Sequence, residues 1–168
     1  MKWVSVNNSS AGQHYELWNA EKKLVSLSIS SRTKIARIEC AAEKRLFFIE
    51  KRGFLQSKTV IKNEYGIKLG ELYGESWEAN EGIIELDGKK YFYEFTHTSE
   101  PELIIYNDES KSKPLVSCSL SSVSEEAAAI VKKSKSLHDT KYPSLLMGLC
   151  WYLLKPAVKE TLTETVAM

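Results

Sequence analysis

From Met1 to Leu120 the chain alternates short apolar segments with polar turns. Each apolar segment is rich in Val, Ile, Phe, Tyr or Trp and is bounded by turn residues, a pattern typical of β-strands. No glycine- or serine-rich linker divides the series, so we expect consecutive strands joined by short connections. The pattern predicts eleven strands: Lys2–Val6, His14–Trp18, Lys23–Ile29, Lys34–Cys40, Arg45–Lys51, Ser57–Asn63, Ile67–Tyr73, Gly82–Leu86, Lys89–Thr96, Leu103–Tyr106 and Leu115–Leu120.

Two connections have the turn chemistry of antiparallel hairpins. Asp87-Gly88 supplies the positive φ values of a tight two-residue turn. Asn63-Glu64-Tyr65-Gly66 places a glycine where a longer hairpin loop needs one. The strands on either side of these turns are therefore expected to pair with each other.

After Leu120 the pattern changes. Ser122 and Glu125 have the spacing of a capping box. The segment that follows, Glu126–Lys133, is rich in helix-favouring alanine, glutamate and lysine. We expect one short helix here.

The segment Tyr142–Leu154 is uncharged and almost entirely apolar, and its apolar residues go round the whole of a helical wheel. Pro143 suits the first turn of such a helix, and Pro156 is expected to end it near Lys155. Burying one large apolar side chain contributes about 1.5 to 3 kcal/mol, so a helix with this composition has to be enclosed by protein.

Eleven strands and one helix that is apolar on every side leave few possible architectures, because an open sheet covers one side of a helix only. A closed sheet encloses the helix and removes unpaired edge strands. About twelve strands make a barrel wide enough for a helix. We therefore expect a mainly β protein, a closed antiparallel barrel of about twelve strands around a central C-terminal helix, with one additional short helix. Residues 1–155 would form one domain and residues 156–168 a polar tail.

The composition limits which partners and which cellular location are expected. The 23 Lys and Arg residues nearly balance the 22 Asp and Glu residues, so no overall field favours nucleic acid. The three cysteines, Cys40, Cys118 and Cys150, are widely spaced among apolar neighbours, as expected of buried thiols in a reducing compartment. No signal-peptide pattern opens the chain, and Tyr142–Leu154 is shorter than the roughly 20 residues of a membrane-spanning helix. The expected location is cytoplasmic, including the membrane periphery, with no transmembrane span.

Several segments between residues 45 and 154 carry a family resemblance: Leu46-Phe47-Phe48-Ile49, Lys58 with the Asn63–Gly66 turn, Leu86-Asp87-Gly88-Lys89, and the apolar helix near the carboxyl end. In these features the chain resembles the tubby C-terminal-like superfamily, in particular its LURP-one-related and phospholipid-scramblase-like branch. The resemblance implies a twelve-stranded barrel around a central helix. In the tubby branch it also implies a basic surface site for phosphoinositide headgroups.

The hairpin of residues 57–73 contains the candidate binding residues. With a three-residue loop and a left-handed Gly66, Ile61, Ile67 and Leu69 point to one face, and Lys58, Lys62 and Lys68 point to the other. Lys62 then lies opposite Lys68. Like charges that face each other across strands are unfavourable, so a bound phosphate would relieve them.

Other interpretations of these lysines stay open. They are also typical of solubilising residues on an outer barrel surface, where lysine protects strand edges. A two-residue loop would shift the register by one residue and move Lys68 to the other face. Lys51 and Arg52 extend the cationic cluster if their strand is adjacent.

No residue pattern indicates a reaction, a metal or a cofactor. His14, His97 and His138 are too far apart in the sequence for a compact metal motif. His138-Asp139 lacks any nucleophile motif of the GxSxG kind. The aromatic residues Tyr91, Tyr93 and Phe95 alternate along one strand and are expected to line the core rather than to stack nucleic-acid bases.

The sequence thus predicts a non-enzymatic cytoplasmic binding module without a cofactor. Its predicted ligand is an anionic lipid headgroup or another phosphate, bound by Lys58, Lys62, Lys68, Lys51 and Arg52 through charge-assisted hydrogen bonds. The alternative is a protein-interaction or scaffold domain with no lipid ligand.

Overall fold

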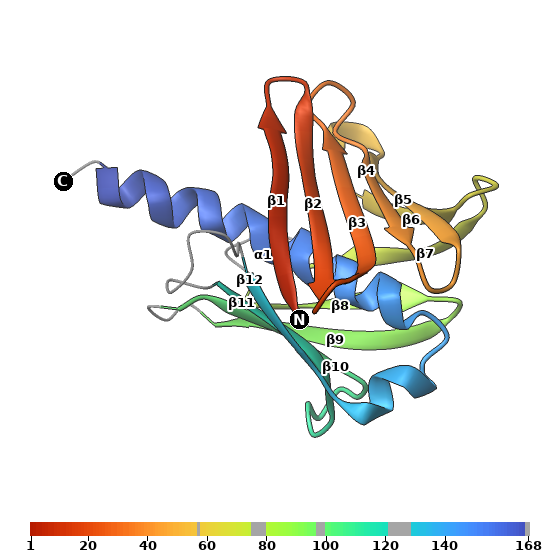
Figure 1. Ribbon diagram of the computed structural model, residues 1–168. Helices are drawn as coiled ribbons and strands as arrows, with labels where there is room; N and C mark the ends of the chain where they lie inside the picture. Colours follow the sequence, from red (N-terminus) through yellow and green to blue (C-terminus); the bar gives the residue numbers. More distant parts are fainter. Residues whose placement is uncertain (57, 75–79, 97–99, 121–128, 167–168) are drawn as a thin grey trace.

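The computed structural model is a closed barrel of twelve antiparallel strands with a long helix, α1, running through it (Figure 1). The structure describes residues 1–56, 58–74, 80–96, 100–120 and 129–166, and their side chains up to Lys155 except that of Gln56. The strands follow one another round the barrel in chain order, and β12 closes it against β1. The expected fold class is confirmed.

The first eleven strands lie where the apolar segments predict them. They are β1 (Lys2–Ser9), β2 (Gly12–Asn19), β3 (Lys22–Ser30), β4 (Ala36–Cys40), β5 (Arg45–Arg52), β6 (Lys58–Asn63), β7 (Lys68–Tyr73), β8 (Glu81–Leu86), β9 (Lys89–Thr96), β10 (Glu102–Tyr106) and β11 (Pro114–Leu120). Inward positions alternate with outward ones, as expected for a barrel wall. Tyr91, Tyr93 and Phe95 are buried on the inner face of β9, which confirms their predicted packing role.

The twelfth strand corrects the prediction of a helix over Glu126–Lys133. Residues 129–133 form β12 (Ala129–Lys133), and the proposed capping box lies outside the described residues. β12 pairs with β11 on one side and with β1 on the other, where Trp3 is opposite Ala129. Local helix propensity amounts to tenths of a kcal/mol per residue, so two ladders of hydrogen bonds and the burial of Ala129 and Val131 outweigh it. The additional short helix comes later, as the 3₁₀ turn η2 (Lys135–Asp139).

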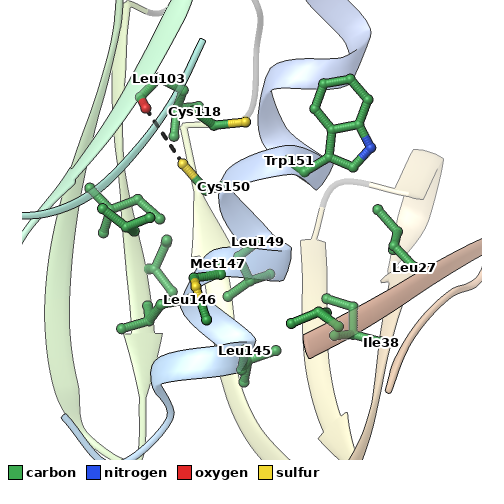
Figure 2. Packing of buried hydrophobic residues seen from close by; sticks show 14 of the residues in the cluster. Leu27, Ile38, Leu103, Cys118, Leu145, Leu146, Met147, Leu149, Cys150 and Trp151 are labelled. Atoms are coloured by element: carbon green, nitrogen blue, oxygen red, sulfur yellow. Dashed lines mark hydrogen bonds between the residues drawn. The ribbon is translucent and has the colours of Figure 1, made fainter. Parts of the chain in front are cut away.

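Helix α1 (Pro143–Val166) begins at the predicted proline, and its first part is buried inside the barrel. Trp151 stacks on Trp3 of β1 and meets the ring of Tyr15 edge-on. At Gly148 an added Cβ would lie 2.9 Å from a methyl carbon of Ile38, so glycine allows the helix to approach β4 closely. Figure 2 shows Trp151 and Ile38 among the apolar side chains around the helix. The apolar segment is enclosed by its own chain, as expected.

The end of α1 differs from the prediction. The helix continues past Pro156 to Val166 instead of ending near Lys155. A proline inside a helix removes one backbone hydrogen bond and bends the helix, but it does not prevent the following residues from resuming the pattern. Ala157, Lys159 and Glu160 are good helix formers. In Figure 1 this part of the ribbon emerges from the barrel towards the C-terminus.

The three cysteines are free and buried, as predicted. The Cys150 thiol donates to the Leu103 carbonyl oxygen at 3.5 Å, and Cys118 lies next to Cys150 in Figure 2. Burial raises the pKa of the Cys150 thiol well above its ordinary value. These thiols therefore behave as apolar core groups.

The two ends of the barrel are distinguished by α1. At the α1-start end, the Tyr142 hydroxyl donates to Asp87 Oδ2 at 2.6 Å in the β8–β9 turn, and the Ser144 hydroxyl donates to Glu43 Oε1 at 2.6 Å in the β4–β5 turn. Because the strands run alternately up and down, the β1–β2, β3–β4 and β5–β6 turns lie at the opposite, α1-exit end. Within the described residues, no helix has both the length and the apolar character needed to cross a membrane.

Candidate ligand-binding surface

The β6–β7 hairpin has the predicted loop. The Gly66 amide donates to the Asn63 carbonyl oxygen at 3.0 Å, Gly66 has φ +75°, and the Asn63 amide donates to the Ile67 carbonyl oxygen at 2.9 Å. Lys62 and Lys68 are paired across the two strands, as predicted from a three-residue loop. The alternative register with a two-residue loop is therefore wrong.

The predicted inward face of this hairpin is only partly right. Ile61 is fully buried, whereas Ile67 is 60% exposed. A bulge leaves Leu69 as an extra residue between the Ile61–Gly70 and Lys62–Lys68 pairs. Ile67 lies beyond that last pair, in the turn, where the barrel wall no longer covers it.

Carboxylates neutralise two of the three hairpin lysines. Lys62 Nζ donates to Glu50 Oε2 at 2.9 Å from the neighbouring strand β5, and Lys68 Nζ donates to Glu71 Oε1 at 2.5 Å. The hydrogen bond from Lys62 is the largest influence on Glu50 and holds the pKa of its carboxyl below the ordinary value. The hydrogen bond from Lys68 lowers the pKa of Glu71 in the same way. The repulsion predicted between Lys62 and Lys68 is thus relieved by the protein itself.

The other three predicted residues gather at the α1-exit end. Arg52 is opposite Lys58 across β5 and β6, and Arg52 also forms an ion pair with Glu50 at 3.0 Å. Lys51 is opposite the buried Thr59, so it occupies an inward-facing position of β5. It lies at the end of the strand, where its side chain is exposed. Neither Lys51 nor Lys58 forms an ion pair with any residue that the structure describes.

Between these cations the chain exposes two large apolar side chains that the sequence prediction missed. Phe54 is 88% exposed and Leu55 is 86% exposed, in the 3₁₀ turn η1 (Phe54–Gln56) that connects β5 to β6. Leu55 has φ +57°, a left-handed conformation that costs a non-glycine residue roughly 1 to 2 kcal/mol. The sequence signal was an apolar pair directly after Gly53, at a point where a connection is expected to be polar. We call Lys51, Arg52, Phe54, Leu55 and Lys58 the basic tip.

A neighbouring turn adds further positive charge beside the basic tip. Ala36 of β4 is opposite Ile49 of β5, so the register places the end of the β3–β4 turn level with the end of β5. That turn carries the exposed residues Arg32 and Lys34. Its own geometry is held by a hydrogen bond from the Lys34 amide to the Ser30 carbonyl oxygen at 3.0 Å.

Two of the three histidines contact neighbouring side chains. His14 Nδ1 lies 2.7 Å from the Ser28 hydroxyl oxygen across β2 and β3, and His138 Nε2 lies 3.0 Å from Lys133 Nζ. His97 lies outside the described residues. In the part of the chain that the structure describes, no three His, Cys, Asp or Glu side chains are grouped so as to hold a metal ion.

The structure shows a closed twelve-stranded barrel with one long helix, and membership of the tubby C-terminal-like superfamily stays a prediction. Comparison of the chain with protein-family models, with curated proteins and with solved structures finds no match.

Proposed function

We propose that this protein binds anionic phospholipid surfaces through its basic tip. The observation that carries the proposal is the combination of two almost fully exposed apolar side chains, Phe54 and Leu55, with the cations of Lys51, Arg52 and Lys58. A protein that lies on a membrane places apolar side chains at the boundary of headgroups and acyl chains and cations at the level of the phosphates.

The expected free energies are sufficient for reversible binding. Transfer of Phe54 and Leu55 out of water contributes about 1.5 to 3 kcal/mol for each side chain that is fully inserted. Each lysine or arginine near an anionic surface contributes about 1 kcal/mol. The free-energy cost of orienting the protein on the membrane offsets part of this total. We therefore expect binding to need both the apolar insertion and the attraction of the cations.

The left-handed conformation of Leu55 supports the same proposal. Exposure of two large apolar side chains and a strained backbone are both unfavourable in water, and strained residues concentrate at functional sites. Insertion of the tip into a bilayer would offset the cost of the exposure. Lys62 and Lys68 contribute less than the sequence prediction supposed, because Glu50 and Glu71 occupy their ammonium groups.

Vesicle sedimentation tests the proposal. Wild-type protein should sediment with phosphatidylcholine vesicles that contain phosphatidylserine and a phosphoinositide, and less with phosphatidylcholine alone. Added salt should weaken this binding, because it screens the charges. F54S/L55S should lose binding by more than about tenfold, since even half the transfer free energy of two such side chains exceeds 1.4 kcal/mol.

The matched control is Y65S/I67S, which removes two comparably exposed apolar side chains from the α1-start end. It should bind vesicles as the wild type does. Equal sedimentation of the wild type with anionic and neutral vesicles, or equal losses in the two double variants, would rule out the basic tip. Retention of a protein partner by wild type and by F54S/L55S alike, with no vesicle binding, would favour the scaffold alternative.

A further inference from the structure

A second surface feature lies on the wall formed by β7, β8 and β9, and β7 is the neighbour of β6, which carries Lys58 of the basic tip. It is a pocket of about 470 Å³, within the size range of small-molecule sites. Its lining residues are Tyr73, Gly74, Glu81, Gly82, Ile83, Phe92, Tyr93, Glu109 and Lys111. They come from three adjacent strands and from the connection between β10 and β11.

The floor of the pocket is apolar and aromatic. Tyr73, Ile83 and Phe92 are neighbours in one row across β7, β8 and β9. Gly82 leaves room for the ring of Tyr93, because an added Cβ would lie 2.3 Å from the Tyr93 hydroxyl oxygen. That hydroxyl donates to the Tyr73 carbonyl oxygen at 3.2 Å. The Tyr73 hydroxyl in turn donates to Glu71 Oε2 at 2.7 Å, so both tyrosine side chains are held in place before any ligand arrives.

The wall of the pocket is a folded connection, residues 107–113. The Lys111 amide donates to the Asp108 carbonyl oxygen at 3.1 Å, and Asp108 Oδ1 accepts hydrogen bonds from the Ser112 amide and hydroxyl at 3.2 and 3.0 Å. This fold brings Lys111 back over the sheet, where its Nζ lies 2.6 Å from Glu81 Oε2 and 3.5 Å from Glu94 Oε2.

The charges favour a cation. Glu81 and Glu94 are opposite each other on β8 and β9, and Glu109 adds a third carboxylate at the rim. The single ammonium of Lys111 balances only part of this negative charge. The hydrogen bond from Lys111 lowers the pKa of Glu81, so this carboxylate is ionised at neutral pH. The position of Lys111 also demonstrates that the chemistry of the site accommodates an ammonium group.

We infer that this pocket is a binding site for a small organic cation that carries an ammonium group. Aromatic faces attract cations through their quadrupoles, and the carboxylates supply the complementary charge. Tyr73 and Phe92 would contact the cation from below, and Glu81 and Glu109 would face it from the rim. The inference is independent of membrane binding, because it uses none of the residues of the basic tip.

Choline is a suitable probe, compared with its uncharged carbon isostere, in which a tert-butyl group replaces the trimethylammonium group. Nuclear magnetic resonance of isotope-labelled full-length protein would follow the amides of Gly74 and Gly82. Choline should shift them saturably, with a dissociation constant on the order of 1 mM for so small a ligand. The isostere should have no comparable effect. Equal shifts with both compounds, or no saturable shift with choline, would overturn the inference.

Three variants assign the interaction to named groups. Phe92→Leu keeps an apolar floor but removes the ring, and should weaken choline binding about threefold. Glu109→Gln should weaken it to a similar extent. Glu85→Gln is the matched control, because it makes the same charge change on β8 outside the lining residues, and should leave binding within twofold, on the order of experimental error.

Lys111→Met provides a test with the opposite sign. Removal of the resident ammonium should strengthen choline binding about threefold, because two carboxylates lose their partner. A folded K111M protein, judged by its unchanged amide spectrum away from the pocket, that binds choline more weakly would contradict the electrostatic assignment. F54S/L55S should bind choline normally and F92L should bind vesicles normally, so failure of either proposal leaves the other standing.

Discussion

The two tips at the ends of strand β6 expose similar apolar side chains but differ in charge. The basic tip has Phe54 and Leu55 between β5 and β6, and the other tip has Tyr65, 81% exposed, and Ile67 between β6 and β7. In this second tip Arg45 Nε donates to Glu64 Oε1 at 3.0 Å and Lys68 is bound to Glu71. We call Tyr65 and Ile67, with these two ion pairs, the paired tip.

Exposed apolar area does not by itself identify a binding surface in this protein. Single exposed apolar residues are normal on protein surfaces. What distinguishes the basic tip is that neither Lys51 nor Lys58 forms an ion pair among the described residues, so their charge is available to an external anion.

Neutralisation of the cations in the basic tip should nearly abolish its binding to anionic vesicles. K51Q/R52Q/K58Q removes three cations at about 1 kcal/mol each, so binding to anionic vesicles should fall roughly 100-fold. Sedimentation over a range of lipid concentrations measures this change. K22Q/K44Q/K90Q alters the net charge equally at the α1-start end and should change binding little. Equal losses in the two triple variants would show that only net charge matters.

Release of the cations in the paired tip should create a second basic tip. In the F54S/L55S background, E64Q/E71Q frees Arg45 and Lys68 beside Tyr65 and Ile67. Two added net charges, at about 1 kcal/mol each, should restore vesicle binding by about 25-fold. Further addition of Y65S/I67S should remove the gain. If E64Q/E71Q restores nothing, charge is not what separates the two tips.

Removal of the carboxylate nearest to the basic tip should strengthen binding. Glu50 binds both Arg52 and Lys62, and Glu50→Gln frees both side chains. One fewer negative charge near the surface should improve vesicle binding about fivefold. Glu21→Gln makes the same charge change in the β2–β3 turn and serves as the control. A weaker-binding E50Q protein would indicate that Glu50 is needed to position Arg52.

Low pH should make the paired tip more like the basic tip, because protonation of a carboxylate releases the lysine that it neutralises. Lys68 holds the pKa of Glu71 below its ordinary value of 4.5, so their ion pair persists at pH 5 and is lost as the pH falls through the lowered pKa. The pair stabilises the fold above pH 4.5, and that stability disappears on further acidification. Y65S/I67S should reduce binding to phosphatidylglycerol vesicles only at a pH below the lowered pKa of Glu71, where Glu71 is protonated and Lys68 is released. The same loss at pH 7 would mean that the paired tip already binds lipid.

Much of the fold follows from local patterns. β-branched and aromatic segments located eleven strands, because a half-buried pleated surface selects those residues. The segment Ala129–Lys133 was assigned to a helix because its helix propensity is local, whereas its pairing with β1 joins residues more than a hundred positions apart. A pattern within one segment carries no information on such a partner.

The candidate site was less predictable. The turn chemistry of Asn63–Gly66 placed Lys62 opposite Lys68 correctly, because turn type determines register. It did not place Glu50 beside Lys62, since that contact depends on β5 being the neighbour of β6. The pocket at Phe92 was not predicted either, because Lys111 reaches Glu81 across thirty residues of sequence.

Local sequence patterns were enough for the first eleven strands, the hairpin turns and the need to enclose an apolar helix, because each of these follows from the nearest neighbours along the chain and from the cost of exposing apolar surface. The tertiary structure decided which charges are neutralised and which face the solvent. A carboxylate affects a lysine only within a few ångströms, and that proximity is established only when the barrel closes.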